Sequence, residues 1–150
     1  MGWTGFNRYK DKWVLCSKAK VLGGAEIDVG PVRLISATQV DELPRHLRHL
    51  LAEELPDVPP PDLNDPRNVL GLRAKAVGAK TWRAFNNIAR TFILREEGES
   101  LVLEEWPKDD GRPIWVKVFQ LGMVDEAVGH VVRLTESNNR RAPKKAEVRQ

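Results

Sequence analysis

One stretch of the sequence decides the fold, and it occurs twice, 84 positions apart. The first copy reads Val32-Arg-Leu-Ile-Ser-Ala-Thr-Gln-Val-Asp-Glu-Leu-Pro-Arg-His-Leu-Arg-His-Leu50, and the second reads Val116-Lys-Val-Phe-Gln-Leu-Gly-Met-Val-Asp-Glu-Ala-Val-Gly-His-Val-Val-Arg-Leu134. Without a gap, the identical pairs are Val32 and Val116, Val40 and Val124, Asp41 and Asp125, Glu42 and Glu126, His46 and His130, and Leu50 and Leu134. Each copy predicts a short strand and then a helix, whose acidic pair caps the positive end of the helix dipole. The repeat predicts a pseudo-symmetric domain built from two strand–helix units.

The segments around these units show the periodicities of further strands and helices. We expect strands at 12–17, 25–35 (one bent strand or two short ones), 90–96, 101–106 and 114–119, and helices at 41–55, 66–77, 80–89 and 125–136. Pro44 is tolerated only in the first turn of its helix, and Glu97–Ser100 is the turn of a hairpin. The second half is therefore helix, three strands and helix. The sequence predicts an α+β fold, a small mixed or antiparallel sheet with packed helices.

The length of 150 residues suits one domain with its own core. We expect this domain to span residues 1–136, with a stiff proline-rich connector at 55–65 and a disordered tail at 137–150. No apolar run approaches the ~20 residues that span a bilayer, and the first residues lack a signal-peptide pattern. The single cysteine, Cys16, excludes an internal disulfide framework. These features predict a cytoplasmic protein with no membrane association.

The basic character of the chain is concentrated at its C-terminal end. The net charge is +3 and the pI is about 9.2. Residues 140–150 contain Arg140, Arg141, Lys144, Lys145 and Arg149 against one acid, Glu147. The remainder of the chain is slightly acidic, so the body and the tail need separate explanations.

No group of residues has the spacing of a catalytic or metal site. The histidines are His46, His49 and His130, and structural zinc normally takes four ligands, whereas Cys16 is the only thiol. Cys16 lies among apolar strand residues, with no basic neighbour to lower its pKa, so we expect a packed thiol. Nucleophile-elbow, phosphate-loop and zinc-protease motifs are absent from the sequence. We therefore predict a protein that is not an enzyme and holds no cofactor or metal; a small hydrolase or metalloenzyme is the least favoured alternative.

Acidic and aromatic residues gather in the second half, where they could form a contact surface. The acids are Glu96, Glu97, Glu99, Glu104, Glu105, Asp109 and Asp110, and Trp106 and Trp115 flank the loop between two predicted strands. Such a surface suits a basic partner protein, because charge steers encounter and aromatic side chains anchor the complex. The candidate contact residues are Glu104, Glu105, Trp106, Asp109, Asp110, Arg112 and Trp115. The alternative is that both tryptophans belong to the core and that the acids are merely solvated.

A second series of residues could contact nucleic acid instead. It comprises the tail and Arg67, Arg73, Lys75, Lys80, Arg83 and Arg90, with Trp82 as a possible stacking platform. A helix with a basic residue every few positions is more often a solvated face. We therefore rank nucleic-acid binding below a protein partner, and we do not expect the folded body to bind nucleic acid.

The second half also carries a family pattern, from about Gly78 to Ser137. Its parts are Lys80-Thr81-Trp82 with Phe85, Arg90-Thr-Phe-Ile-Leu, a strand ending Trp106-Pro107, a loop with Gly111, Val116-Lys-Val-Phe, and Asp125-Glu126-Ala-Val-Gly129-His-Val-Val-Arg133-Leu. This pattern resembles the immunity proteins of bacterial contact-dependent growth inhibition systems. In the first half, only the weaker strand–helix similarity is present.

The resemblance implies a cytoplasmic antidote rather than an enzyme. Such a protein forms a heterodimer with the toxic C-terminal domain of its cognate effector, often a nuclease, and blocks the active site or the access of substrate. On this hypothesis the candidate contact residues of Glu104–Trp115 bind the toxin. Many nuclease antidotes are strongly acidic, whereas here only the body is acidic, and only slightly.

Overall fold

The computed structural model describes residues 2–22, 24, 26–60, 71–109 and 111–148, and for 137–148 it describes the backbone alone. Its strands are β1 (Trp3–Tyr9), β2 (Lys12–Val21), β3 (Glu26–Ser36), β4 (Asp57–Val58), β5 (Arg90–Glu97), β6 (Ser100–Trp106) and β7 (Trp115–Gln120). Its helices are the 3-10 helix η1 (Ala37–Glu42), α1 (Leu43–Ala52), α3 (Leu72–Ala76), α4 (Trp82–Ile88) and α5 (Val124–Val148). The predicted α+β class is confirmed, with more of the chain in strands than expected.

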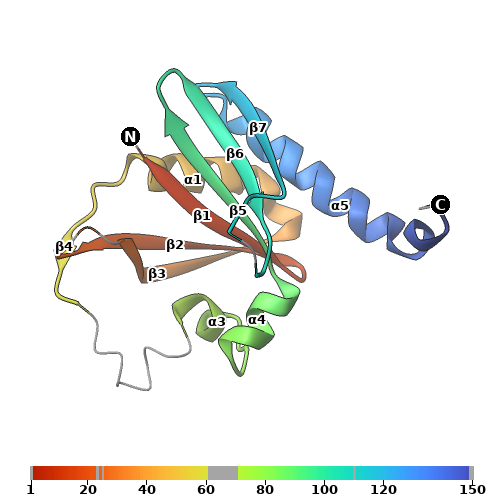
Figure 1. Ribbon diagram of the computed structural model, residues 1–150, viewed down its shortest axis with the longest axis horizontal. Coiled ribbons are helices and arrows are strands. Elements are labelled where there is room, and N and C mark those ends of the chain that lie inside the picture. Colours follow the sequence, from red (N-terminus) through yellow and green to blue (C-terminus); the bar gives the residue numbers. More distant parts are fainter. Residues whose placement is uncertain (1, 23, 25, 61–70, 110, 149–150) are drawn as a thin grey trace.

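The sheet is antiparallel except for β4. Its strand order is β3-β2-β1-β5-β6-β7, and β4 adds a short parallel pairing to β2 (Figure 1). Each half of the order is a three-stranded meander whose chain continues into a helix, α1 after β3 and α5 after β7. The two meanders meet where β1 pairs with β5 in the middle of the sheet.

The strand registers of the two halves correspond. In the first half Phe6 pairs with Leu15 and Trp13 with Ile35; in the second half Leu94 pairs with Leu103 and Leu101 with Phe119. All of these side chains point to the face of the sheet that α1 and α5 cover. The two halves thus have the same order of strands and the same facing pattern, while the repeat in sequence stays a prediction.

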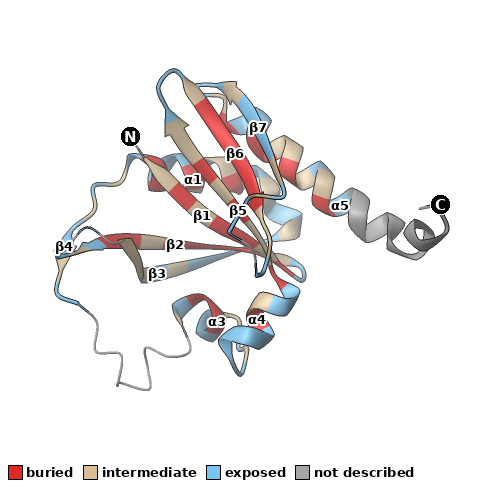
Figure 2. Ribbon diagram, in the orientation of Figure 1, coloured by how far each residue is buried: buried red, intermediate tan, exposed pale blue. Residues whose placement is uncertain are grey.

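The main core lies between the sheet and helices α1 and α5 (Figures 1 and 2). It comprises Phe6, Trp13, Leu15, Ile35, Leu43, Leu47, Leu50, Leu51, Phe92, Leu94, Leu101, Leu103, Val124, Ala127, Val128 and Val131. Period-two alternation supplies the strand residues, and the leucine stripe of α1 supplies the helical ones. Arg48 of α1 bonds Asp125 of α5 at 2.6 Å, so Asp125 joins the two helices at the surface.

Helices α3 and α4 cover part of the opposite face, beside β1, β2 and β3. Their core cluster contains Tyr9, Val14, Ala74, Phe85 and Ala89. The rings of Tyr9 and Phe85 stack with centroids 5.2 Å apart. Phe85 is therefore buried, whereas Trp82 and Ile88, three positions to either side of it on α4, are both 46% exposed.

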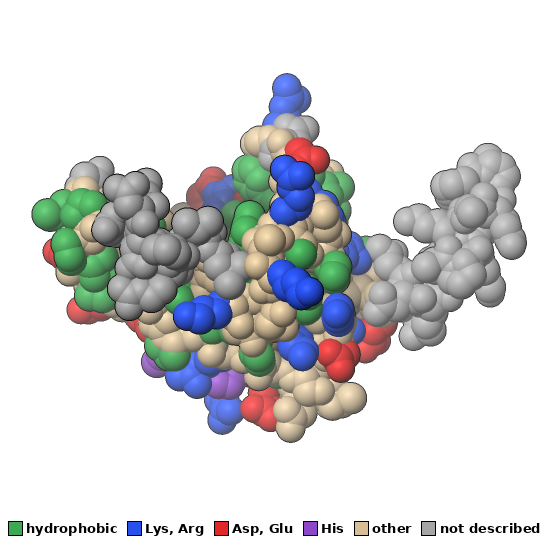
Figure 3. Space-filling view, turned by 90° about the horizontal axis from the view of Figure 1, so that it is seen from below, with side chains coloured by type: hydrophobic (Ala, Val, Ile, Leu, Met, Phe, Trp, Pro, Cys, Tyr) green, Lys and Arg blue, Asp and Glu red, His purple; other side chains and the backbone are tan. Residues whose placement is uncertain are grey.

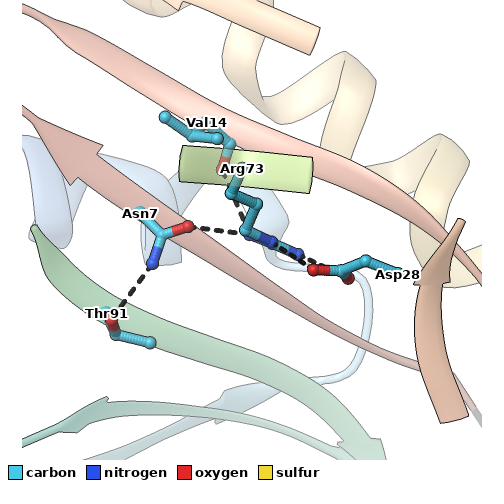
Figure 4. A network of polar contacts seen from close by, with 5 residues as sticks. All are labelled: Asn7, Val14, Asp28, Arg73 and Thr91. Atoms are coloured by element: carbon cyan, nitrogen blue, oxygen red, sulfur yellow. Dashed lines mark hydrogen bonds and ion pairs between the residues drawn. The ribbon is translucent and has the colours of Figure 1, made fainter. Parts of the chain in front are cut away.

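A buried arginine fastens α3 to the sheet (Figure 4). Arg73 donates from Nε and Nη2 to the two carboxylate oxygens of Asp28 on β3, at 2.8 and 3.2 Å. Its Nη1 donates to Oδ1 of Asn7 on β1 at 2.8 Å, and Asn7 Nδ2 donates to Thr91 Oγ1 on β5 at 3.0 Å. One guanidinium thus connects α3 to three strands, which satisfies polar groups that burial would otherwise leave unpaired.

One strand is absent from the sequence predictions, and one alternative that they left open is now decided. No strand is predicted for residues 3–9, yet β1 lies at the centre of the sheet. Residues 3–9 have a half-polar sequence, and they form a strand because β2 pairs with one edge of it and β5 with the other. Residues 26–36 form one strand, whose pairing is irregular between Cys16 and Lys18, which decides between the two alternatives left open.

The connector and the helix ends also differ from expectation. Asp57–Val58 pair with β2, so the connector is partly a strand rather than a pure spacer; its residues 61–65 and the expected helix start at Asp65-Pro66 lie outside the described residues. α5 continues past its expected end at Glu136 to Val148. The predicted disorder of residues 137–150 stays a prediction.

The acidic pair Asp41-Glu42 does not cap α1 through side-chain hydrogen bonds. The cap belongs to Ser36, whose hydroxyl accepts from the Thr38 amide at the start of η1. Glu42 makes no cap hydrogen bond and instead lies 3.7 Å from Arg45. The predicted position of Pro44 in the first turn of the helix is confirmed.

Replacing Arg73 tests its role in holding α3 against the sheet. We expect Arg73→Met to lower the free energy of unfolding by about 3 kcal/mol, because Asp28 and Asn7 then lose a buried partner. Chemical denaturation measures this change, and Arg83→Met, at an exposed position of α4, serves as the matched control. A loss below about 1 kcal/mol for Arg73→Met, within the usual range of surface substitutions, would contradict the assignment.

Candidate functional site

The predicted contact residues lie at the end of β6, in the following loop and at the start of β7. Successive side chains of a strand point to opposite faces, so Glu105 faces α1 and α5 while Glu104 and Trp106 face the other side. The acidic pair of the sequence is thus divided between two environments.

Glu105 is buried and fully engaged. It is 6% exposed, and its two oxygens accept from Nε and Nη2 of Arg90 at 2.8 and 2.7 Å. Trp115 Nε1 also donates to Oε1 of Glu105, at 2.9 Å. This carboxylate therefore links β5, β6 and β7, and its charge is compensated inside the fold.

Glu104 is likewise buried, on the opposite face. It is 7% exposed and accepts from Trp106 Nε1 at 3.1 Å and from Nη2 of Arg95 at 3.3 Å. Neither acid of the pair is therefore a free surface charge. Their assignment as contact residues stays a prediction. In the structure both carboxylates accept hydrogen bonds from arginine and tryptophan side chains of the same domain.

The other candidate residues differ widely in exposure. Asp109 and Arg112 are exposed, Trp106 is half-buried, and Asp110 lies outside the described residues. Trp115 is half-buried against the core, with ring centroids 6.4 Å from Phe92 and 5.4 Å from His130. The two tryptophans thus have different surroundings, and only Trp106 borders an open pocket.

That pocket has a volume of about 430 Å³ and lies beside the loop that follows β6. It is lined by Ala89, Arg90, Glu105, Trp106, Pro107, Lys108, Asp109 and Ile114. Asn86 on α4 donates to the carbonyl oxygen of Lys108 at 3.4 Å, and this hydrogen bond connects the loop to α4. The pocket combines an aromatic wall, a fixed ion pair and a charged rim.

The pocket brings together only some of the predicted residues. Glu105, Trp106 and Asp109 line it, whereas Glu104, Arg112 and Trp115 do not. Sequence reasoning missed Arg90 and Ile114 as members of this site. The hairpin register could have found Arg90, because a turn at Glu97–Ser100 places the start of β5 beside the end of β6.

Next to the pocket, apolar side chains of β7 and of the residue just before it are exposed to solvent. Ile114 is 60% exposed, Val116 51% and Val118 60%. Val116 and Val118 pair with Glu104 and Val102, so they lie on the face that α1 and α5 leave uncovered. Helices α3 and α4 cover only the other half of this face, beside β1, β2 and β3 (Figure 2). We call these three residues the apolar strip. Exposed apolar patches of this kind mark interaction surfaces when they are contiguous.

Among the described residues, the cysteine thiol is buried and no cluster of metal ligands forms. Cys16 is buried, as predicted, and burial raises the pKa of its thiol to about 11, so it is protonated at neutral pH. Within the part of the chain that the structure describes, no three His, Cys, Asp or Glu side chains are placed to hold a metal ion.

The basic series proposed for nucleic acid is partly used inside the fold. Arg73 and Arg90 are committed to Asp28 and Glu105, and Arg67 lies outside the described residues. Lys75, Lys80 and Arg83 are exposed, as is Trp82. In the view from below, Lys and Arg side chains are spread among hydrophobic ones rather than gathered in one patch (Figure 3).

Comparison with known proteins yields a likeness of fold. No family model matches the chain, and no curated protein matches it. A solved structure, a protein of unknown function named NMB0488 from Neisseria meningitidis, superposes with a TM-score of 0.59 at 13% identity, over 91% of this chain and 94% of that one. At this identity the likeness shows a shared fold alone. No helix among the described residues is long and apolar enough to cross a membrane.

The ion pair at the floor of the pocket can be tested by stability. We expect Glu105→Gln to lower the free energy of unfolding by about 2 kcal/mol, because Arg90 loses a charged partner in a partly buried position. Asp109→Asn, at an exposed position of the same loop, is the control and should change stability by less than about 0.5 kcal/mol. Denaturant unfolding measures both, and equal effects of the two changes would contradict the structural role of Glu105.

His130 predicts a pH dependence of stability. Burial lowers its pKa in the folded protein, and nearby Lys117 and Arg133 lower it further. The unfolded chain then binds the proton more readily, so the contribution to stability is complete above about pH 6.5 and is lost as the pH falls. Unfolding measured at pH 7.5 and pH 5 should show a smaller decrease for His130→Gln than for the unaltered protein. Identical decreases would contradict this role.

Proposed function

We propose that this protein is an immunity protein that binds and neutralises the toxin domain, a nuclease, of a contact-dependent growth inhibition effector. One observation carries the proposal: an open pocket walled by Trp106, with exposed Ile114 and charged Asp109 on its rim. The family pattern of residues 78–137 supports the same function. The action is tight heteromeric binding in the cytoplasm, with no reaction catalysed.

The pocket has the construction of a protein-binding hot spot. Such sites combine a buried aromatic or arginine anchor with a rim that excludes water. Trp106 is held by its hydrogen bond to Glu104, and Arg90 by its two bonds to Glu105. Because these walls are already ordered, binding a partner side chain in the pocket costs the antidote little conformational entropy.

The internal pairing of Glu104 and Glu105 refines the kind of toxin surface expected. Charge for steering is left to Asp109, Lys108 and Arg112, which are all exposed and carry both signs. A partner loop with an apolar or aromatic anchor and a basic neighbour fits this rim. Apolar contact then carries most of the affinity, and charge governs mainly the rate of association.

We further infer that the two strand–helix units form a structural pseudo-repeat. The gap-free alignment places buried positions on buried positions: Leu43 on Ala127, Leu47 on Val131, and Leu51 on Thr135. The equivalent registers of the two meanders support the same inference. The contact surface of Glu104–Trp115 then lies on one unit only, where the loop of residues 107–114 joins β6 to β7.

A second candidate function, nucleic-acid binding, is favoured by the exposure of Trp82. This ring is 46% exposed and stands on α4 near exposed Lys80 and Arg83, an arrangement suited to stacking on a base. Trp82 also packs on Phe85, at 5.2 Å between centroids, which provides a structural reason for its presence. The candidate ranks second because Arg73 and Arg90 are occupied.

Co-expression with the toxin domain encoded immediately upstream of its gene tests the leading proposal. We expect rescue of growth and a one-to-one complex, with Ile114→Asp weakening the complex at least tenfold because the apolar contact is lost. Leu22→Asp, at a 73% exposed position of a turn, is the matched control and should leave binding unchanged. Asp109→Lys should slow association with a basic toxin. Absence of rescue and complex, with salt-sensitive nucleic-acid binding that fades on deletion of residues 140–150, would favour the second candidate.

A further inference from the structure

The two edges of the sheet are protected unequally. β3 carries the Gly30-Pro31 step, and its pairing with β2 has an irregularity between Cys16 and Lys18. β7 contains no proline, and its register with β6 is unbroken from Ser100↔Gln120 to Glu105↔Trp115. Prolines, bulges and charged side chains are the usual means of preventing edge strands from pairing with other chains. Within the described residues, β7 has neither a proline nor a register shift, and Lys117 is its one charged side chain.

Backbone groups at alternate positions of β7 point away from the sheet. The Leu121 amide donates to the Glu99 carbonyl oxygen at 3.0 Å, which continues the β6–β7 register by one step. In an antiparallel ladder, every second residue exchanges hydrogen bonds with its partner and the intervening residues face outward. Phe119 and Lys117 therefore bond toward β6, and Val116, Val118 and Gln120 present their N–H and C=O groups at the free edge. β7 is the last strand on this side of the sheet (Figure 1).

Exposed apolar side chains belong to these same outward-facing residues. Val116 is 51% and Val118 60% exposed. The edge thus offers unpaired backbone groups together with apolar side chains at period two. An extended strand with the same apolar alternation provides the matching chemistry.

We propose that β7 pairs antiparallel with β7 of a second copy of this chain, across a two-fold axis at Val118. The second copy supplies a strand of the required pattern, and a two-fold contact between identical strands is self-complementary. The pairing joins two sheets into one and covers Val116 and Val118. This inference does not depend on the proposed function, and the pocket beside Trp106 lies beyond the paired residues 116–120.

Charge selects the register of this pairing. Lys117 is the only charged residue of Trp115–Gln120. An axis at Lys117 would set two ammonium groups directly opposite each other, which is unfavourable. An axis at Val118 sets Lys117 opposite the partner's Phe119, and Val116 opposite the partner's Gln120. Lys117 Nζ already lies 5.8 Å from the ring of its own Phe119, so a second aromatic face extends an existing cation–π contact.

The small size of the contact sets its strength. Stable interfaces bury about 1,200 Å² or more in total, and a single pair of short strands buries less. We therefore expect a reversible dimer whose population rises with concentration. Sedimentation equilibrium of the purified full chain, from micromolar to millimolar concentration, measures its dissociation constant.

Charge swaps at the axis provide the sharp test, because only the residue on the axis faces itself. V118K and V118E alone should each raise the dissociation constant at least tenfold, by placing like charges in contact. An equimolar mixture of the two variants should restore association as a heterodimer, which also shows that both are folded. V29K, at a 39% exposed position of the other edge strand β3, is the matched control and should dimerise like the unaltered chain.

Three results would overturn the proposal. The first is an unaltered chain that stays monomeric throughout the concentration range. The second is a dimer whose dissociation constant V118K and V118E leave unchanged, which assigns the contact to another surface. The third is a mixture of V118K and V118E that remains monomeric while each variant unfolds cooperatively like the unaltered chain.

Discussion

The antiparallel pairing of β1 with β5 is the contact on which the rest of the structure depends. Each half of the chain is a three-stranded meander with one helix, and neither has a second layer of its own large enough to bury both of its faces. Pairing β1 with β5 sets Phe6 against Phe92, with ring centroids 5.5 Å apart, and brings Trp13 to 6.2 Å from Phe92. On the other face the same pairing positions Asn7 and Thr91 for the Arg73 network. One strand pair therefore organises both layers.

The distribution of charge between interior and surface determines what this protein can offer to a partner. Arg73, Arg90 and Arg95 each neutralise an acid within the fold. A basic or acidic series in the sequence is consequently a poor guide to the surface, because ion pairs across strands remove its members. What is left exposed is an aromatic pocket with a rim of mixed charge and a strand of alternating valines. Both features suit recognition by protein surfaces, through side-chain anchoring in one case and backbone pairing in the other.

Much of the fold could be predicted because its signals are local. The leucines of α1, the β5–β6 hairpin and the alternation of β7 each lie within one short segment, so periodicity alone identifies them. β1 could not be found in this way, since Thr4, Asn7 and Arg8 interrupt its apolar pattern and only pairing on both edges makes it a strand. The candidate site was half predictable. Trp106 and Asp109 line the pocket, but strand alternation places Glu104 and Glu105 on opposite faces, where arginine and tryptophan partners bury both.

The sequence by itself determined the α+β class, the core faces of the helices and strands, and the placement of Cys16 in the interior, because burial of apolar surface follows periodicity along the chain. Only the tertiary structure decided the order of the strands, the partners of the arginines and which edge of the sheet remained open. These depend on contacts between residues far apart in sequence, such as Arg73 with Asp28 and Asn7, whose direction no local pattern records. The surface that a partner meets is what those distant contacts leave unpaired.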